Sequence, residues 1–108
     1  MTRWKRAERR IAQLTGGHRV PVTGRRGQPD VAHPWLALEV KTRDRLPRWL
    51  VAALAQAQAV ADRDQLPVAV LHEHGARYRD ALVVLRLGDF LDWFVGAGAQ
   101  DVKGRQEG

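Results

Sequence analysis

The sequence predicts an α/β domain with a mixed central β-sheet and helices on its faces. Segments with strand-like alternation or short apolar runs are interspersed with segments of helical periodicity, in the order α-β-β-β-α-β-β-α. The chain has 108 residues, of which 44% are hydrophobic and 28% charged, which suits one hydrophobic core and argues against a disordered chain. The domain is expected over residues 1–95, and the polar, Gly-rich residues 96–108 are expected to be a disordered tail.

The first helix is expected over residues 3–14, where apolar residues recur at helical spacing: Trp4, Ala7, Ile11 and Leu14. Gly16 follows it and can supply the left-handed residue with which helices commonly end. A short edge strand is expected over residues 18–23, since its proline cannot donate to a ladder. A flexible basic loop then spans residues 24–28, and another short strand begins at Asp30.

The clearest strand is expected over residues 36–41, because larger apolar residues alternate there with small or charged ones. The alternation divides the segment between two faces: Leu36, Leu38 and Val40 on one, and Ala37, Glu39 and Lys41 on the other. A strand this apolar on one side is expected to be central in the sheet, with its second face buried as well.

The second half of the chain repeats the helix-and-strand pattern. An Ala-rich helix is expected over residues 48–61, opened by Pro47. The next strands and the hairpin connection between them follow: 66–72, 75–79 and 81–87. A short final helix is expected over residues 88–95, with Asp89 as its N-cap.

The net charge of +6 lies entirely in the first thirty residues, where eight Lys or Arg stand against Glu8 and Asp30. A basic face on an otherwise balanced domain attracts polyanions through counterion release, so nucleic acid is a candidate partner. The plainer interpretation is a basic face that is simply solvated.

Several classes of protein are excluded or disfavoured. The chain has no cysteine, so disulfide scaffolds, zinc–thiolate sites and cysteine nucleophiles are excluded. Its apolar runs are far shorter than the roughly 20 residues that cross a bilayer, and its basic start lacks the apolar stretch of a secretory signal. No membrane contact and a cytoplasmic location are therefore expected.

Two acidic residues and a lysine are spaced in the sequence so that they could form a metal-dependent catalytic site. Glu39 and Lys41 are two residues apart and project from the same strand face, and Asp30 precedes Glu39 by nine residues on the neighbouring short strand. Two carboxylates side by side repel each other unless a divalent cation lies between them, and hard oxygen ligands select Mg²⁺ or Mn²⁺. Such an ion activates water for phosphodiester hydrolysis, while Lys41 stabilises the developing negative charge.

Glu39 and Lys41 also have a plainer interpretation, and three other residues are weaker candidates for a functional site. Glu39 and Lys41 can form an ordinary ion pair on an exposed sheet face. His72 and His74 are spaced so that both could bind zinc, but no third ligand of the usual kind is nearby. An exposed Trp49 could contact DNA or a partner.

Further features favour the catalytic interpretation and carry a family resemblance. Pro29 and Asp30 form a Pro-Asp pair, which is followed by Glu39-Val40-Lys41 and then by a helix that bears glutamine. This arrangement resembles the PD-(D/E)XK nuclease superfamily, whose fold is restriction-endonuclease-like. The wider pattern ERRIAQLTGGHRVPVTG, PDV, LALEVKTR and LPRWL resembles phage and archaeal Holliday junction resolvases, over nearly the whole chain from Glu8 to Phe94.

The resemblance implies roles residue by residue. Asp30, Glu39 and the carbonyl of Val40 would ligate Mg²⁺, for which Mn²⁺ would substitute. Glu8 would bind or position a second metal or a ligated water. Lys41 would be the catalytic lysine, and Gln56, or its competitor Gln58, would orient the water or the lysine.

The resemblance also implies a DNA substrate and a dimer. Phosphate contacts would come from the first helix, the edge strand and the basic loop: Arg6, Arg9, Arg10, Arg19, Thr23, Arg25 and Arg26. Paired incision of a four-way junction by one kind of chain requires two sites related by a two-fold axis, so a homodimer acting on branched double-stranded DNA is expected. A flap-, nick- or single-strand-directed nuclease of the same fold and a non-catalytic basic DNA-binding module are the alternatives.

Overall fold

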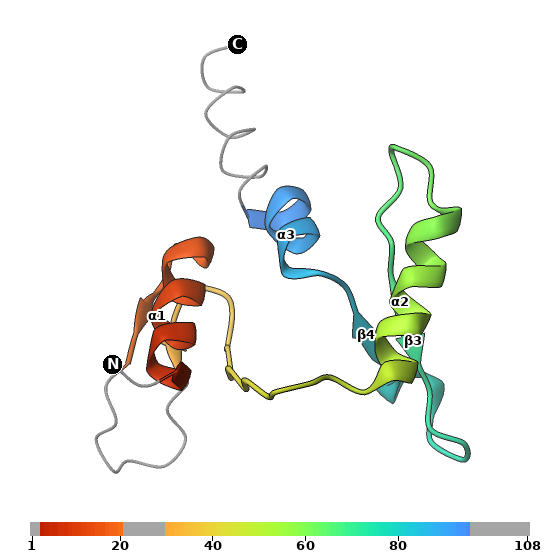
Figure 1. Ribbon diagram of the computed structural model, residues 1–108, viewed down its shortest axis with the longest axis horizontal. Coiled ribbons are helices and arrows are strands. Elements are labelled where there is room, and N and C mark those ends of the chain that lie inside the picture. The colour runs from red at the N-terminus through yellow and green to blue at the C-terminus, as the bar shows by residue number, and fades with distance from the viewer. Residues whose placement is uncertain (1–2, 21–29, 96–108) are drawn as a thin grey trace. The chain divides into compact units, whose positions relative to one another are not determined.

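The computed structural model describes residues 3–20 and 30–95 (Figure 1). Contacts between residues group the chain into two compact units, Met1–Asp44 and Arg45–Gly108, and each is described by itself. The expected tail, residues 96–108, lies outside the described residues, so its disorder remains a prediction. Among the described helices, none has the length and apolarity needed to span a membrane.

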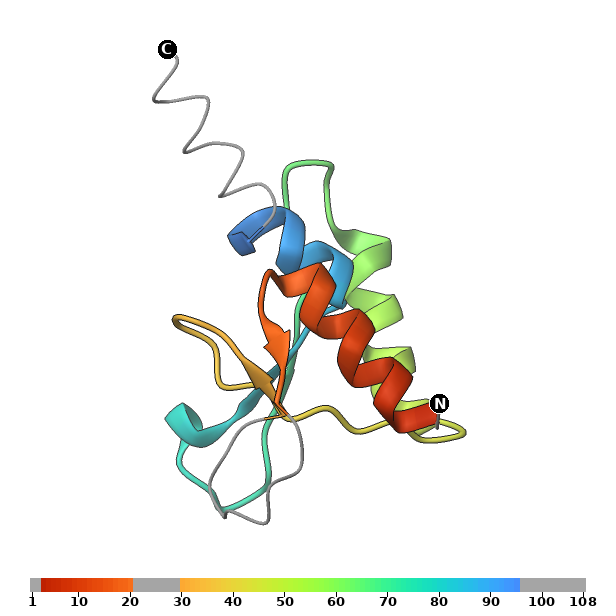
Figure 2. The same ribbon diagram turned by 90° about the vertical axis from the view of Figure 1, so that its left-hand side faces the viewer.

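The first unit consists of helix α1 (Arg3–Thr15) and two short strands, β1 (His18–Arg19) and β2 (Val31–Ala32). The strands pair antiparallel, with His18 opposite Ala32, and α1 packs against both of them (Figure 2). Val31 is completely buried at the centre of this unit. The helix and the strand after Asp30 are therefore confirmed. The strand expected at 18–23 is seen over two residues, and its last three residues lie outside the described part.

The end of α1 confirms the role expected of glycine. Gly16 has a φ of +81°, and its N–H donates to the carbonyl of Gln13 at 3.4 Å, while the Gly17 N–H donates to the carbonyl of Ala12 at 2.9 Å. This pair of bonds is a Schellman motif, which satisfies two carbonyls that the helix itself leaves without partners. It turns the chain directly into β1.

The buried side of α1 differs from the expected apolar stripe. Its buried residues are Glu8, Ala12 and Thr15, whereas Trp4 and Leu14 are 44% and 40% exposed. The two-residue strands offer the helix only a narrow packing surface, and the polar groups turned toward it have partners. The Thr15 hydroxyl, for example, donates to the carbonyl of Ile11 at 2.9 Å.

The strand expected over residues 36–41 is not formed, although its two faces are distinct. Leu36, Leu38 and Val40 are partly buried, and the residues between them are exposed, so the expected alternation is confirmed. Only Leu38 forms a β-bridge, opposite Val31, and the Asp30 N–H donates to the Leu38 carbonyl at 3.0 Å. The Val40 N–H is bound instead by the Asp30 side chain, which takes the place of a ladder partner. The expected burial of the second face is wrong.

The second unit is built from helix α2 (Arg48–Val60) and a hairpin of β3 (Ala69–Leu71) and β4 (Leu82–Val84). The strands pair antiparallel with Ala69 opposite Val84, and α2 packs against β3 (Figure 1). Leu54 on the helix and Ala69 on the strand are buried in this unit. The expected helix and both expected strands are thus present, the strands in shorter form.

The connection and the end of the second unit hold short helices. A 3₁₀-helix (Tyr78–Asp80) precedes β4, and α3 (Leu87–Phe90) continues into one π-helical segment (Leu91–Val95). The expected capping role of Asp89 is wrong. The helix begins at Leu87 after an Arg86 that makes no side-chain cap, which places Asp89 inside the first turn. There its charge favours the positive end of the helix dipole without capping it.

The mixed α/β class is confirmed, whereas the sheet arrangement differs from the expectation. The described strands form two separate two-stranded sheets, each antiparallel and each within one unit. The described strands therefore do not form the single mixed sheet expected from the sequence. The segment expected to be its central strand, residues 36–41, contributes one bridge only.

Candidate functional site

A pocket in the first unit collects several of the residues singled out in the sequence. Helix α1 contributes Arg3, Trp4 and Glu8, and the rest of the wall comes from Asp30 and residues 40–43. Its volume, about 620 Å³, is in the range of pockets that hold small molecules or groups. Of the residues expected to act in catalysis or to bind metal, Glu8, Asp30, Val40 and Lys41 all line it.

One hydrogen bond joins the Pro-Asp acid to the Glu-Val-Lys segment. The Val40 N–H donates to Asp30 Oδ2 at 2.6 Å, across ten residues of chain and in a partly buried position. This distance is at the short end for a charge-assisted bond. The bond fixes one carboxylate oxygen of Asp30 beside the backbone of Val40, and thereby brings Asp30 next to the segment that carries Glu39 and Lys41.

Glu39 and Lys41 are at the surface. Their side chains are 62% and 68% exposed, and Lys41 Nζ lies 4.0 Å from Glu39 Oε2. An exposed pair at this distance contributes little to stability, so it does not fix either side chain. The expected burial of this carboxylate and ammonium is therefore wrong, whereas the exposed pair agrees with the plainer interpretation of Glu39 and Lys41. Lys41 lines the pocket, whereas Glu39 is not part of its wall.

Glu8 and Arg19 form the most buried ion pair of the described residues. Arg19 Nε donates to Glu8 Oε2 at 2.7 Å, with the two side chains 19% and 9% exposed. The Arg19 guanidinium also lies over the Trp4 ring, with Cζ 5.8 Å from its centroid. Glu8 therefore points inward. Its basic partner comes from β1, however, and not from the neighbouring arginines on α1.

A basic surface lies on the outer side of α1. Arg6, Arg9 and Arg10 are all exposed, and Lys5 Nζ lies 5.4 Å from the Trp4 ring centroid. Of the other residues expected to bind DNA, Thr23, Arg25 and Arg26 lie outside the described residues.

Gln56 and Gln58 lie on α2, in the second unit. Both are exposed, while the packed side of the helix carries Leu50, Ala53, Leu54 and Ala57. The burial pattern therefore does not separate the two glutamines, and the choice of Gln56 remains a prediction.

The sequence reasoning did not identify Arg43 as a wall residue. Arg43 lines the pocket beside Thr42, and its Nη1 donates to the Thr42 carbonyl at 3.0 Å. The alternation that places Glu39 and Lys41 on one face continues to residue 43, so the signal was present in the sequence.

The donor chemistry of the pocket fits a hard divalent cation. Asp30 supplies a carboxylate and Val40 a backbone carbonyl at the pocket wall, and Glu39, next to Val40 in the chain but outside the wall, carries a second carboxylate. These are the ligand types that Mg²⁺ and Mn²⁺ prefer. Asp30 Oδ1 accepts no hydrogen bond from any described residue and remains available as a ligand. Three side-chain ligands are nevertheless not gathered at one point anywhere in the described part of the chain.

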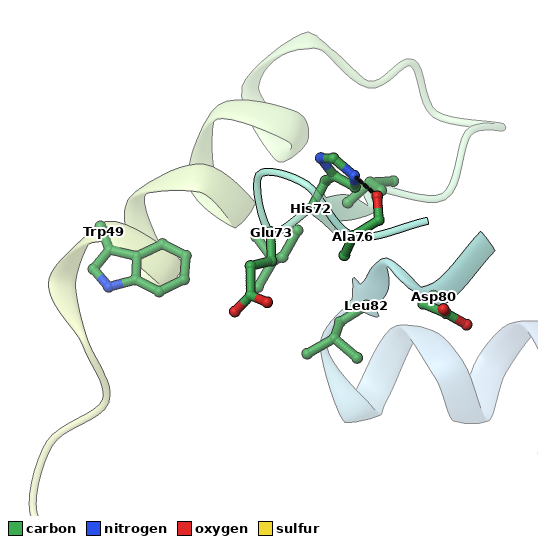
Figure 3. Close-up of a pocket in the computed structure, with 8 residues that line it drawn as sticks. Trp49, His72, Glu73, Ala76, Asp80 and Leu82 are labelled. Atoms are coloured by element: carbon green, nitrogen blue, oxygen red, sulfur yellow. Dashed lines mark hydrogen bonds between the residues drawn. The ribbon is translucent and has the colours of Figure 1, made fainter. Parts of the chain in front are cut away.

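A second pocket lies in the other unit, over the β3–β4 hairpin (Figure 3). Trp49 and Leu82 form apolar parts of its wall, and Trp49 is 62% exposed, as the sequence suggested. His72 Nε2 donates to the Ala76 carbonyl at 2.8 Å and its ring stacks on Tyr78, with centroids 4.5 Å apart. These contacts give His72 a structural role in the hairpin turn.

Comparisons of this chain with protein-family models, with curated proteins and with solved structures find no match.

Proposed function

We propose that this chain is a metal-dependent, structure-selective endodeoxyribonuclease that resolves four-way DNA junctions. The observation that carries the proposal is the 2.6 Å hydrogen bond between the Val40 N–H and the Asp30 carboxylate. It places an acid beside a Glu-Val-Lys segment, in a pocket lined by Lys41 as well. The segment that carries Lys41 also carries Glu39 and the Val40 carbonyl. Asp30 and residues 39–41 therefore offer two carboxylates, a carbonyl and an ammonium, which are the groups that hydrolysis of a phosphodiester requires.

Asp30, Glu39 and the Val40 carbonyl would hold the divalent cation. Mg²⁺, or Mn²⁺ in its place, supplies polarisation of a phosphoryl oxygen and activation of water when it is bound. Asp30 is already oriented for this role by the Val40 N–H. The exposed Glu39 side chain is held only by a pair at 4.0 Å, so it can leave Lys41 at little cost.

Lys41 would act on the phosphate itself. Lys41 lines the pocket and its side chain is about two-thirds exposed, so a bound phosphate group can reach it. An ammonium placed next to a reacting phosphate stabilises the negative charge that grows in the transition state. The role that the resemblance to PD-(D/E)XK nucleases implies for Gln56 stays a prediction, because Gln56 belongs to the second unit.

The DNA would lie on the basic surface of α1. Arg6, Arg9 and Arg10 are exposed there, and arginines bind phosphates through a planar set of donors. Paired incision of a branched double-stranded DNA by one kind of chain calls for a homodimer, acting in the cytoplasm of a cell or of a phage-infected host.

Two observations favour a second candidate function, a basic DNA-binding module without catalytic activity. Three side-chain metal ligands are not gathered in the described residues, and Glu39 pairs with Lys41 rather than lining the pocket. This module would use the same arginines and would bind branched DNA without cutting it.

Cleavage of an immobile four-way junction separates these possibilities. The junction is compared with matched duplex, flap and single-stranded DNA, in Mg²⁺, in Mn²⁺ and in EDTA, with wild type and Asp30→Asn. Asp64→Asn is a matched control, because Asp64 is an exposed acid of the second unit that does not line the pocket.

Paired, symmetric nicks in the junction alone are expected, with loss in EDTA and in Asp30→Asn and no change in Asp64→Asn. Equal cleavage of flaps or duplex would retain the metal site and contradict the junction as substrate. Tight junction binding without cutting in either metal would contradict the enzyme and support the binding module.

A further inference from the structure

We propose that Glu8 is a positioning residue that presents the Arg19 guanidinium to a DNA phosphate, and not a ligand of the metal. This inference rests on the proposed function, because it assigns part of the DNA contact at the same site. It differs from the role that the family resemblance implies, in which Glu8 serves a metal or its water.

The Glu8 carboxylate is already neutralised by a basic partner. Its Oε2 accepts a hydrogen bond from Arg19 Nε at 2.7 Å, and its side chain is only 9% exposed. A cation bound at Glu8 would therefore lie close to a guanidinium, which has no uncharged form in proteins. Asp30 is different, since its partner is a neutral backbone N–H.

Arg19 is held on two sides, and its terminal nitrogens remain available as hydrogen-bond donors. Nε is engaged by Glu8, and the guanidinium lies over the Trp4 ring with Cζ 5.8 Å from its centroid. The two terminal nitrogens make no hydrogen bond to any described residue. A guanidinium whose orientation is set before binding loses less freedom when it takes a phosphate oxygen.

Arg19 contacts two residues of the pocket wall. Trp4 and Glu8, the two residues that hold it, both line the pocket together with Asp30 and Lys41. Arg19 itself does not line the pocket, so its place beside the candidate site is set through its contacts with these two wall residues. A phosphate bound by Arg19 would lie beside the part of the wall that Trp4 and Glu8 form.

The test uses the sign of the change in DNA affinity. Glu8→Gln removes a negative charge, so simple electrostatics makes the protein more basic and its DNA binding tighter. If Glu8 positions Arg19, the affinity for a four-way junction, measured in Ca²⁺ or EDTA, should instead fall about tenfold, because glutamine replaces a charge-assisted hydrogen bond to Arg19 Nε with a weaker neutral one. Arg19→Lys, which keeps the charge and loses the planar donors, should give a fall of similar size.

Asp44→Asn is the matched control. Asp44 also pairs with an arginine, Arg3, at 2.9 Å, but both side chains are more than 70% exposed, so this pair holds nothing in place. Asp44→Asn is expected to leave junction affinity unchanged or to raise it slightly. The double variant Glu8→Gln/Arg19→Lys should bind no more weakly than the weaker single variant, because both changes remove one interaction.

Mn²⁺ affinity in the absence of DNA, measured by electron paramagnetic resonance of the free ion, distinguishes a ligand from a positioning residue. Glu8→Gln is expected to bind Mn²⁺ like wild type, whereas Asp30→Asn binds it more weakly. A Glu8→Gln variant that loses Mn²⁺ affinity, or that binds DNA more tightly, would overturn the inference.

The thermal unfolding of each variant is measured by circular dichroism. DNA and Mn²⁺ affinities are then compared only at temperatures at which every variant is folded. A wild-type protein that binds neither junction nor duplex would contradict the proposed function itself. This result can be told apart from failure of the Glu8 inference, in which wild type binds DNA and Glu8→Gln binds it equally well or more tightly.

Discussion

Replacing Asp30 with Asn and with Ala separates its structural role from its chemical role. Asp30 Oδ2 accepts the Val40 N–H at 2.6 Å in a partly buried position. A hydrogen bond to a charged group contributes about 1.5–3 kcal/mol, and a neutral one about 1 kcal/mol. Asp30→Asn keeps an acceptor oxygen and should lower the free energy of unfolding by about 1 kcal/mol. Asp30→Ala removes the acceptor and should lower it by about 2–3 kcal/mol.

The two variants should behave alike in catalysis. Both remove the negative charge that would bind Mg²⁺, so junction cleavage should fall at least about a hundredfold in each, a loss of at least about 2.7 kcal/mol of transition-state stabilisation. Urea unfolding followed by circular dichroism gives the stabilities, and single-turnover cleavage of a labelled junction gives the rates. Equal destabilisation by Asn and Ala would contradict the role of the hydrogen bond. Near-normal cleavage by Asp30→Asn would contradict the role of the charge.

The remaining predictions concern the lysine, the helix turn and the basic surface. Lys41→Met should lower the single-turnover cleavage rate by about 100-fold or more. Because Lys41 is exposed, the same change should alter the free energy of unfolding by no more than about 0.5 kcal/mol. A cleavage rate within threefold of wild type would exclude a catalytic lysine. Gly17→Ala should cost about 1–3 kcal/mol in urea unfolding, since its Cβ would press on the Ala32 carbonyl oxygen and lie 2.9 Å from Val31 Cγ1, and an unchanged midpoint would contradict this packing. The logarithm of DNA affinity should fall linearly with the logarithm of salt concentration, and the slope should decrease by about 0.9 for each exposed arginine of α1 replaced by Gln: Arg6, Arg9 or Arg10. An unchanged slope would show that the arginine tested does not contact phosphate.

Local sequence signals predict the helices and turns of this chain well. The periodicity of residues 3–14 and the Ala-rich run from residue 48 correspond to α1 and α2. Gly16 adopts the positive φ that its position after a helix suggests. These features depend on interactions within a few residues, which is the range that propensity and periodicity describe.

Interactions across ten or more residues account for what the sequence did not reveal. The segment 36–41 has the alternation of a strand, but the Asp30 side chain binds the Val40 N–H, and only one bridge forms. The apolar stripe of α1 similarly gave no sign that the partner of Glu8 would be an arginine eleven residues further on. In the candidate site, spacing identified Asp30, Glu39 and Lys41 as a group, whereas the exposure of Glu39 and Lys41 depends on how few strands cover them.

The contacts that build the pocket have a consequence for how the first unit folds. The Glu8–Arg19 pair closes a loop of eleven residues, and the Asp30–Val40 bond closes one of ten. Loops of this length close on a timescale of roughly 10–100 ns, and their closure entropy is small compared with that of long-range pairings. The residues of the candidate site can therefore find one another by local diffusion of neighbouring segments, before distant parts of the chain have to meet.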